Sequence, residues 1–122
     1  MLKTSLNKLA RIDSGKSFRH KIKDNPEGGC WVIQMKDISN EELAITGTPQ
    51  SINLNEVKQN QLLQKGDILF MAKGNNNFAI PFNTDYPAVA VSLFFIVRPL
   101  HDRVDPAYLA WYLNSPSAQS YF

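Results

Sequence analysis

The segment that most constrains the fold of this chain is residues 62–74, whose pattern is typical of a turn, a buried strand and a second turn. Lys65-Gly66-Asp67 suits the first turn, because glycine takes positive φ without steric cost and aspartate can bond its own backbone. The unbroken apolar run at residues 68–71 predicts a strand covered on both faces. Such a strand needs neighbours, so the rest of the chain must supply them.

A hairpin is predicted around the second turn. Lys73-Gly74-Asn75-Asn76-Asn77 ends the apolar run with one cation, a glycine and three amides. Residues 78–80 would then pair back, and Pro81 closes the hairpin at a position that needs no ladder donor. On pattern alone, the simplest interpretation of residues 73–77, the hairpin tip, is structural.

Further strands follow from the same rules. Residues 31–35 are rich in β-branched and aromatic side chains and predict a strand. Residues 89–97 look like the most buried strand of the chain, ended by Arg98-Pro99. Residues 6–12 predict a short helical turn running into a strand that closes at Ser14-Gly15, and residues 51–54 a short strand.

One helix is well signalled near the end of the sequence. Asp105 suits an N-cap and Pro106 the first helical position, where a missing N–H costs nothing. Tyr108, Leu109, Tyr112 and Leu113 recur at helical spacing and predict one apolar stripe. Ser115-Pro116 repeats the cap-and-proline pattern and predicts another helix from residue 117.

Length and composition bound the class of protein. At 122 residues, 43% of them apolar, the chain is expected to form one globular domain. Cys30 is the only cysteine, which excludes an internal disulfide framework. No run approaches the ~20 apolar residues of a membrane helix, and the N-terminus lacks the continuous apolar core of a secretory signal. We therefore expect a cytoplasmic protein with no membrane partner.

The charge is unevenly distributed. Residues 1–23 contain seven lysines and arginines against Asp13, a net charge of +6, which leaves −4 for the rest because the whole chain carries +2. A basic segment on a mildly acidic body indicates a localised contact with a polyanion. The alternative is a charged face that is simply solvated.

Little in the sequence points to catalysis or to a cofactor. His20, His101 and Cys30 match no zinc-binding spacing, so no metal or cofactor is expected. Asp37 and Glu56, followed by Lys58, loosely resemble the acidic residues and lysine of metal-dependent nucleases, but Glu56 lies in a polar run where no apolar strand would fix its geometry.

A peptidase is the other enzymatic alternative. Gly66-Asp67-Ile68-Leu69 also occurs in the LexA-like peptidase fold, which needs a serine nucleophile and a lysine base. Ser92 and Lys73 are the only candidates for this pair, and nothing in the sequence places Ser92 at an exposed turn. No phosphate-binding loop or dinucleotide fingerprint is present either, so we expect no enzymatic activity and no catalytic residues.

Four segments together resemble one family. They are Leu-Ala-Arg-Ile-Asp-Ser-Gly-Lys-Ser at residues 9–17, Val-Ile-Gln-Met-Lys-Asp-Ile at 32–38, Leu-Gln-Lys-Gly-Asp-Ile-Leu-Phe at 63–70, and Val-Asp-Pro-Ala-Tyr-Leu-Ala-Trp-Tyr-Leu-Asn-Ser at 104–115. In this order and spacing they resemble the target recognition domain of type I restriction–modification specificity subunits. The resemblance runs from about Leu6 to the last residue.

The resemblance implies a fold and a function. The fold class would be α/β, of the α+β type, with a twisted, mixed, mainly antiparallel sheet and short flanking helices. The domain would read half of a bipartite target in double-stranded DNA, and a long helix would dock it onto the methyltransferase (modification) subunits of a complex that also holds a restriction subunit. Residues 1–122 would form one such domain, C-terminally incomplete, because the chain stops where the long helix and a second recognition domain would follow.

The residues of the sequence agree with DNA binding. Neutralising phosphates is the role expected of Lys16, Arg19, Lys21 and Lys23. Hydrogen bonding to base edges is the role expected of Ser17, Gln34, Asn75, Asn76 and Asn77, with Lys73 as a cation beside the last three. Lys16 to Lys23 is predicted to form a polar, basic loop, and Phe18 is expected to hold this loop in place and not to stack on a base. The alternative function is a structural or interaction protein that pairs with other restriction–modification subunits without binding DNA.

Overall fold

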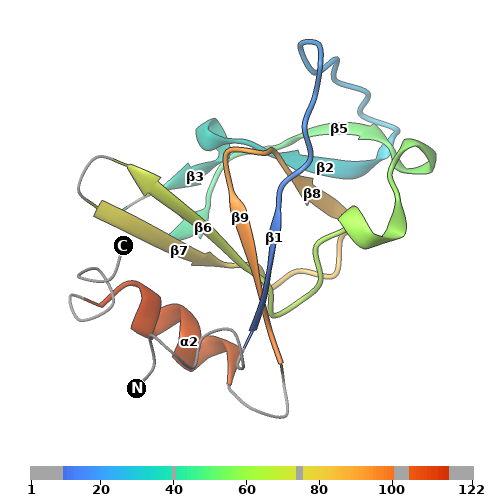
Figure 1. Cartoon of the computed structure of the whole chain (residues 1–122). Coiled ribbons are helices and arrows are strands. Elements are labelled where there is room, and N and C mark those ends of the chain that lie inside the picture. The colour runs from blue at the N-terminus through green and yellow to red at the C-terminus, as the bar shows by residue number, and fades with distance from the viewer. Residues whose placement is uncertain (1–9, 40, 74–75, 101–104, 116–122) are drawn as a thin grey trace.

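The computed structural model describes residues 10–39, 41–73, 76–100 and 105–115, with the backbone alone at residues 72, 73, 76 and 77 (Figure 1). A four-stranded antiparallel sheet has the order β1 (Ala10–Ser14), β9 (Phe95–Pro99), β6 (Ile68–Lys73), β7 (Asn76–Pro81). A three-stranded sheet has the order β5 (Gln50–Asn53), β2 (Gly29–Ile33), β8 (Ala88–Ala90), in which β2 is antiparallel to β5 and parallel to β8.

Shorter elements complete the described chain. They are the two-residue strands β3 (Ile38–Ser39) and β4 (Ala44–Ile45), the 3-10 helices η1 (Met35–Asp37), η2 (Leu54–Glu56) and η3 (Gln59–Gln61), and the helix α2 (Pro106–Leu113). The expected mixed α+β architecture with mostly antiparallel strands is confirmed, with α2 as the one α-helix of the described residues.

Strand β6 lies between two layers, as its apolar run predicts. Leu69 and Met71 face the three-stranded sheet and belong to the core between the two sheets. Ile68 and Phe70 face the other way and pack in a cluster with the buried side of α2. Figure 1 shows α2 and the three-stranded sheet on opposite sides of the four-stranded sheet. A strand with both faces covered in this way needs apolar residues at every position.

The prediction of a single strand over residues 89–97 is wrong. This run forms β8 and β9, which belong to different sheets and are joined by a turn closed by the hydrogen bond from Phe94 N to Val91 O, 3.1 Å long. Ser92 lies exposed in that turn, contrary to expectation. Phe94 is fully buried although it belongs to the turn, so the apolar run continues through a change of direction that hydrophobicity alone does not reveal. Strand β9 also continues to Pro99, past the expected end.

The expected strand at residues 31–35 is shifted. β2 ends at Ile33, and Gln34 is the N-cap of the 3-10 helix η1, where its N–H donates to Asp37 Oδ2 at 2.9 Å. The side chain of Asp37, three residues after Gln34, accepts a local hydrogen bond that competes with continued strand pairing.

The hairpin β6–β7 is confirmed, but its tip is shorter than residues 73–77. Lys73 pairs with Asn76, and Ala72 with Asn77, so three of the five expected tip residues belong to the ladder. Residues 74 and 75 lie outside the described part of the chain.

Helix α2 begins where the sequence predicts, and its buried face is different. Asp105 Oδ1 accepts a hydrogen bond from Ala107 N at 3.3 Å. Leu109 and Leu113 are buried as expected, with Ala110 beside them, whereas Tyr108 is 52% exposed. A small alanine lets the helix approach the sheet closely, and the tyrosine lies outside the contact. The helical turn expected before residue 10 and the helix expected from residue 117 fall outside the described residues.

Candidate nucleic-acid interface

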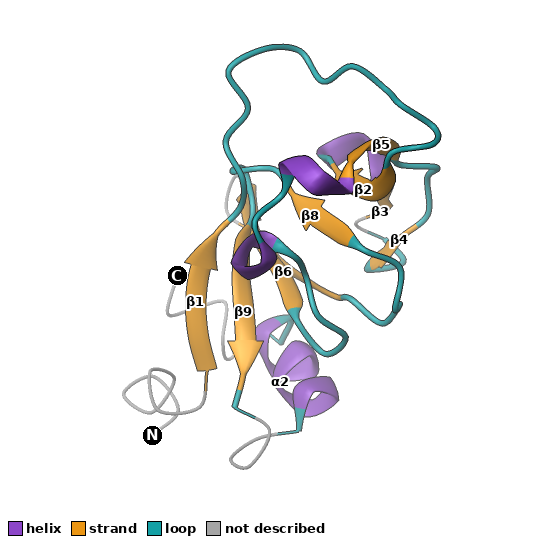
Figure 2. Cartoon of the chain, turned by 90° about the vertical axis from the view of Figure 1, so that its right-hand side faces the viewer, coloured by secondary structure: helices purple, strands orange, loops and turns teal. Residues whose placement is uncertain are grey.

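Residues 16–23, the basic loop, are held at both ends by the three-stranded sheet. At the first end, Gly15 N donates to Phe94 O at 3.0 Å and Lys16 N donates to Ala90 O at 2.7 Å. Just beyond the second end, Ser51 N donates to Asp24 Oδ1 at 2.9 Å. The loop therefore starts beside β8, ends beside β5 and passes over the outer face of the sheet (Figure 2).

Two apolar side chains hold the middle of the basic loop. Phe18 and Ile22 pack against a cluster on the outer face of the three-stranded sheet that includes Cys30 and Val89. The expectation that Phe18 holds the loop in place is confirmed. Cys30 is fully buried beneath, and burial raises the pKa of its thiol, so this cysteine acts as a packing residue rather than as a reactive thiolate.

The cations of the basic loop face solvent. Arg19, Lys21 and Lys23 are exposed, and among the described residues no carboxylate lies within ion-pair distance of them. Lys16 is half-buried, with its Nζ 5.5 Å from the centroid of the Phe18 ring. Ser17 is exposed between them. With the apolar side chains turned inward and the charges outward, the loop presents a positive surface to solvent.

Gln34 lies near the start of the basic loop but is already hydrogen-bonded. Ile33 pairs with Ala90, whose carbonyl also accepts from Lys16 N, so Gln34 lies about two strand spacings, ~10 Å, from Lys16. Its side-chain amide donates to Gln50 Oε1 at 2.8 Å. A base contact by Gln34 would have to break or share that bond.

The hairpin tip does not join the basic loop. Lys73, Asn76 and Asn77 end the β6–β7 hairpin, and β7 is the edge strand farthest from β1. Figure 1 shows this end of the hairpin on the left of the molecule, well separated from the loop at the top. Asn75 lies outside the described residues. The sequence-predicted DNA contacts thus fall into two regions on different elements.

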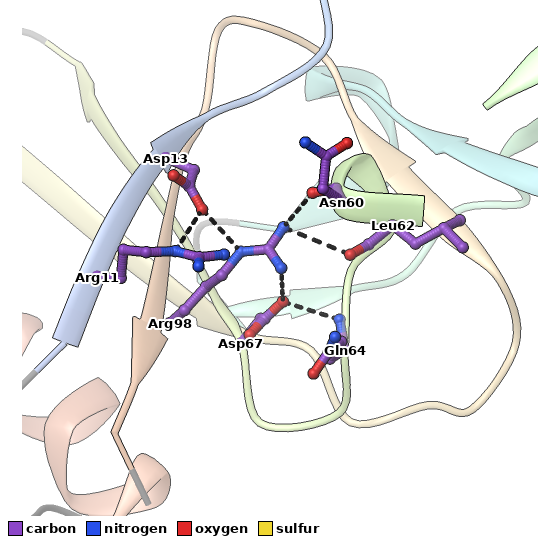
Figure 3. A network of polar contacts seen from close by, with 7 residues as sticks. All are labelled: Arg11, Asp13, Asn60, Leu62, Gln64, Asp67 and Arg98. Atoms are coloured by element: carbon purple, nitrogen blue, oxygen red, sulfur yellow. Dashed lines mark hydrogen bonds and ion pairs between the residues drawn. The ribbon is translucent and has the colours of Figure 1, made fainter. Parts of the chain in front are cut away.

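Two arginines next to the basic loop were not identified from the sequence. Arg11 on β1 lies directly opposite Arg98 on β9, and Asp13 Oδ2 lies 3.1 Å from the Nε of each (Figure 3). Arg11, Asp13 and Arg98 lie on the same face of the four-stranded sheet as Ile96. That face is directed toward the core between the two sheets. The sequence offered only an Arg-Ile-Asp alternation on β1, and the partner strand comes from the other end of the chain.

Arg98 also fixes the segment that leads into the central turn. Its Nη2 donates to the backbone carbonyls of Asn60 and Leu62 at 3.3 and 3.4 Å, and its Nη1 lies 4.0 Å from Asp67 Oδ2 (Figure 3). Asp67 in turn closes the predicted turn, because Oδ2 accepts from Gln64 N at 2.8 Å. Burial raises the pKa of the Asp67 carboxyl, against the lowering effects of that hydrogen bond and of the Arg98 charge.

We expect this raised pKa to appear in the pH dependence of stability. Between the pKa of the unfolded chain, about 3.9, and the higher folded value, the folded state holds more protons, so stability falls as pH rises through that window. Asp67→Asn keeps an oxygen acceptor for the Gln64 N–H and removes the titration. The wild-type free energy of unfolding should therefore fall relative to that of the variant between acidic and neutral pH, measured by urea unfolding. The reverse trend would mean that pairing with Arg98 outweighs burial.

The residues named for the nuclease and peptidase alternatives lie on separate elements. Asp37 is buried, with its carboxylate occupied by Gln34 N and by Lys36 Nζ at 3.1 Å. Glu56 is exposed on η2 beside the basic loop. Ser92 is exposed, and the Lys73 side chain lies outside the described structure. Over the described ranges, no three His, Cys, Asp or Glu side chains gather as metal ligands, and no helix is long and apolar enough to cross a membrane.

The sequence matches no protein-family model and no curated protein.

Proposed function

We propose that this chain is a DNA-binding module of the kind found in the target recognition domains of type I restriction–modification specificity subunits. It would read half of a bipartite target in double-stranded DNA and act without chemistry of its own. Methylation and restriction would belong to the modification and restriction subunits with which it assembles.

The observation that carries this proposal is the basic loop. Four cations, Lys16, Arg19, Lys21 and Lys23, lie on a segment fixed at both ends and in the middle. A phosphate contact gains most when the cation is already positioned, because less side-chain and loop entropy is lost on binding. Phosphate contacts place a protein on the duplex, and exposed polar groups such as Ser17 can then meet base edges.

We expect binding of the isolated chain to duplex DNA to weaken steeply with salt. Four phosphate contacts release counterions and give a log–log slope of about −4. Fluorescence anisotropy over a salt series measures this slope, and the double variant Lys21→Gln, Lys23→Gln should reduce its magnitude by about 2. Lys65→Gln is the matched control, because Lys65 is exposed in the turn before β6, outside the basic loop.

A flat salt response at measurable affinity would contradict the proposal. The affinity of the isolated chain should lie near the non-specific range, ~10⁻⁴ to 10⁻⁶ M, because a half-site reader makes half of the contacts. Cleavage of DNA in the presence of magnesium, or cleavage of the chain itself, would favour the enzymatic alternatives instead.

A second candidate function, an interaction module that does not bind DNA, is favoured by the outer side of α2. Tyr108 and Trp111 are 52% and 66% exposed, and their ring centroids lie 5.9 Å apart on the face turned away from the sheet. Exposed aromatic side chains are typical of protein interfaces. Co-purification with a modification subunit, with no DNA binding in the salt series, would support this function over the first.

A further inference from the structure

A polar cleft lies beside the basic loop, between β1 and the 3-10 helix η3. It has a volume of about 400 Å³, and its lining includes Arg11, Asp13, Lys16 and Arg98. Lys16 also lines the hollow under the basic loop, so the two depressions meet at this lysine. The positive surface therefore extends from the loop onto β1 and β9.

The charges of the cleft are not balanced by its own side chains. Among the described residues, three cations line it against Asp13 alone, which leaves a net charge of +2 on this part of the lining. Like charges directly opposite on neighbouring strands are destabilising, and Arg11 and Arg98 occupy such a pair. One oxygen, Asp13 Oδ2, is shared by both guanidinium groups. A further anion between Arg11 and Arg98 would offset the repulsion between their two positive charges.

Arg98 is a fixed cation with unused donor capacity. Its side chain is 11% exposed, and Nη2 is held by two backbone carbonyls. Nε is buried and makes no aligned hydrogen bond to any residue that the structure describes, although Asp13 Oδ2 is 3.1 Å away. The Asp67 carboxylate lies 4.0 Å from Nη1, beyond hydrogen-bond distance. Arg98 also lines the cleft, so an anion bound there would meet the part of the guanidinium that faces the opening.

Arg11 is the exposed counterpart of Arg98. Its side chain is 64% exposed, and its pairing with Asp13 is a surface ion pair of the kind that contributes little to stability. Exchanging that carboxylate for a phosphate costs little, and a guanidinium can bind a phosphate through two parallel hydrogen bonds. Lys16 adds a third cation at the mouth of the cleft.

We infer that this cleft binds a phosphate group through Arg11, Lys16 and Arg98. In the complex with DNA, which rests on the proposed function, the group is a backbone phosphate adjacent to those held by the basic loop. Arg98 supplies the fixed charge, Arg11 closes over the phosphate, and Lys16 connects this contact to the loop.

The first arm of the test uses inorganic phosphate and the intact chain. In ¹H–¹⁵N NMR spectra, the side-chain Nε resonances of Arg11 and Arg98 and the amide of Gly15 should shift saturably in millimolar phosphate. Arg11→Gln should abolish the shift at Arg98, and Arg11→Lys should keep part of it. The same variants remain folded because Arg11 is exposed. No saturable shift in the wild-type protein would overturn the inference.

The second arm identifies the source of the phosphate. In the DNA salt series, Arg11→Gln should reduce the magnitude of the slope by about 1, with Lys65→Gln unchanged. A phosphate shift with unaltered DNA binding by Arg11→Gln would overturn the assignment to the DNA backbone. A phosphate shift in a protein that binds no DNA would refute the proposed function and leave a site for a free phosphate-bearing molecule.

Discussion

Gly15→Ala is expected to destabilise the fold by about 3 kcal/mol or more. Gly15 passes directly over the turn that joins β8 to β9, and a Cβ there would lie 2.0 Å from Val91 O and 2.8 Å from Ala90 O. Both atoms are backbone, so no side chain can rotate away to relieve the overlap. The strands on either side of Val91 belong to different sheets, and a shift at this point would disturb both.

Urea unfolding followed by circular dichroism measures the cost of Gly15→Ala, and Ser14→Ala is the matched control. Ser14 is exposed on β1, one residue earlier, so its truncation should change the free energy of unfolding by less than about 0.5 kcal/mol. Equal stability of the two variants would show that the chain can move off the turn. Gly15→Ala should also weaken DNA binding, because the hydrogen bond from Lys16 N to Ala90 O fixes the start of the basic loop.

Asn114→Ala is expected to lower the free energy of unfolding by about 2–3 kcal/mol. β7 is an edge strand, and at Ala79 its outward backbone groups are bonded to the Asn114 amide. Ala79 N donates to Asn114 Oδ1 at 2.8 Å, and Asn114 Nδ2 donates to Ala79 O at 2.7 Å. Ala79 is fully buried, so truncation of Asn114 leaves a donor and an acceptor without these partners.

A comparison of variants separates the loss of these hydrogen bonds from the general effect of shortening a side chain. Asn114→Asp keeps the acceptor for Ala79 N and removes the donor, so its cost should differ from that of Asn114→Ala. Asn55→Ala, at an exposed site on η2, should change stability by less than about 0.5 kcal/mol. If Asn114→Ala costs no more than Asn55→Ala, packing of α2 alone holds it to β7. The hairpin carrying Asn76 and Asn77 is the part of the molecule whose position this contact secures.

Local chemistry in the sequence determined several elements of this protein. Gly66 has a φ of +100°, and Asp67 bonds Gln64 N, as their residue types predict for a turn. The run after this turn forms a strand covered on both faces. The start of α2 at Pro106 follows from its N-cap. The basic loop was also predictable, because its three lysines and one arginine lie close together in the sequence and the glycines and proline that follow it are a local signal of a break.

Only the tertiary structure decided how the remaining parts meet. The apolar run from Val89 to Val97 divides between two sheets because Phe94 can be buried within a turn, and hydrophobicity does not encode direction. Arg11 and Arg98 face each other because β1 pairs with β9, a contact between opposite ends of the chain. Local sequence sets the conformation of each segment. The pairing of distant strands depends instead on how much apolar surface the whole sheet buries on its two faces. The cleft that Arg11 and Arg98 line therefore exists only in the folded protein.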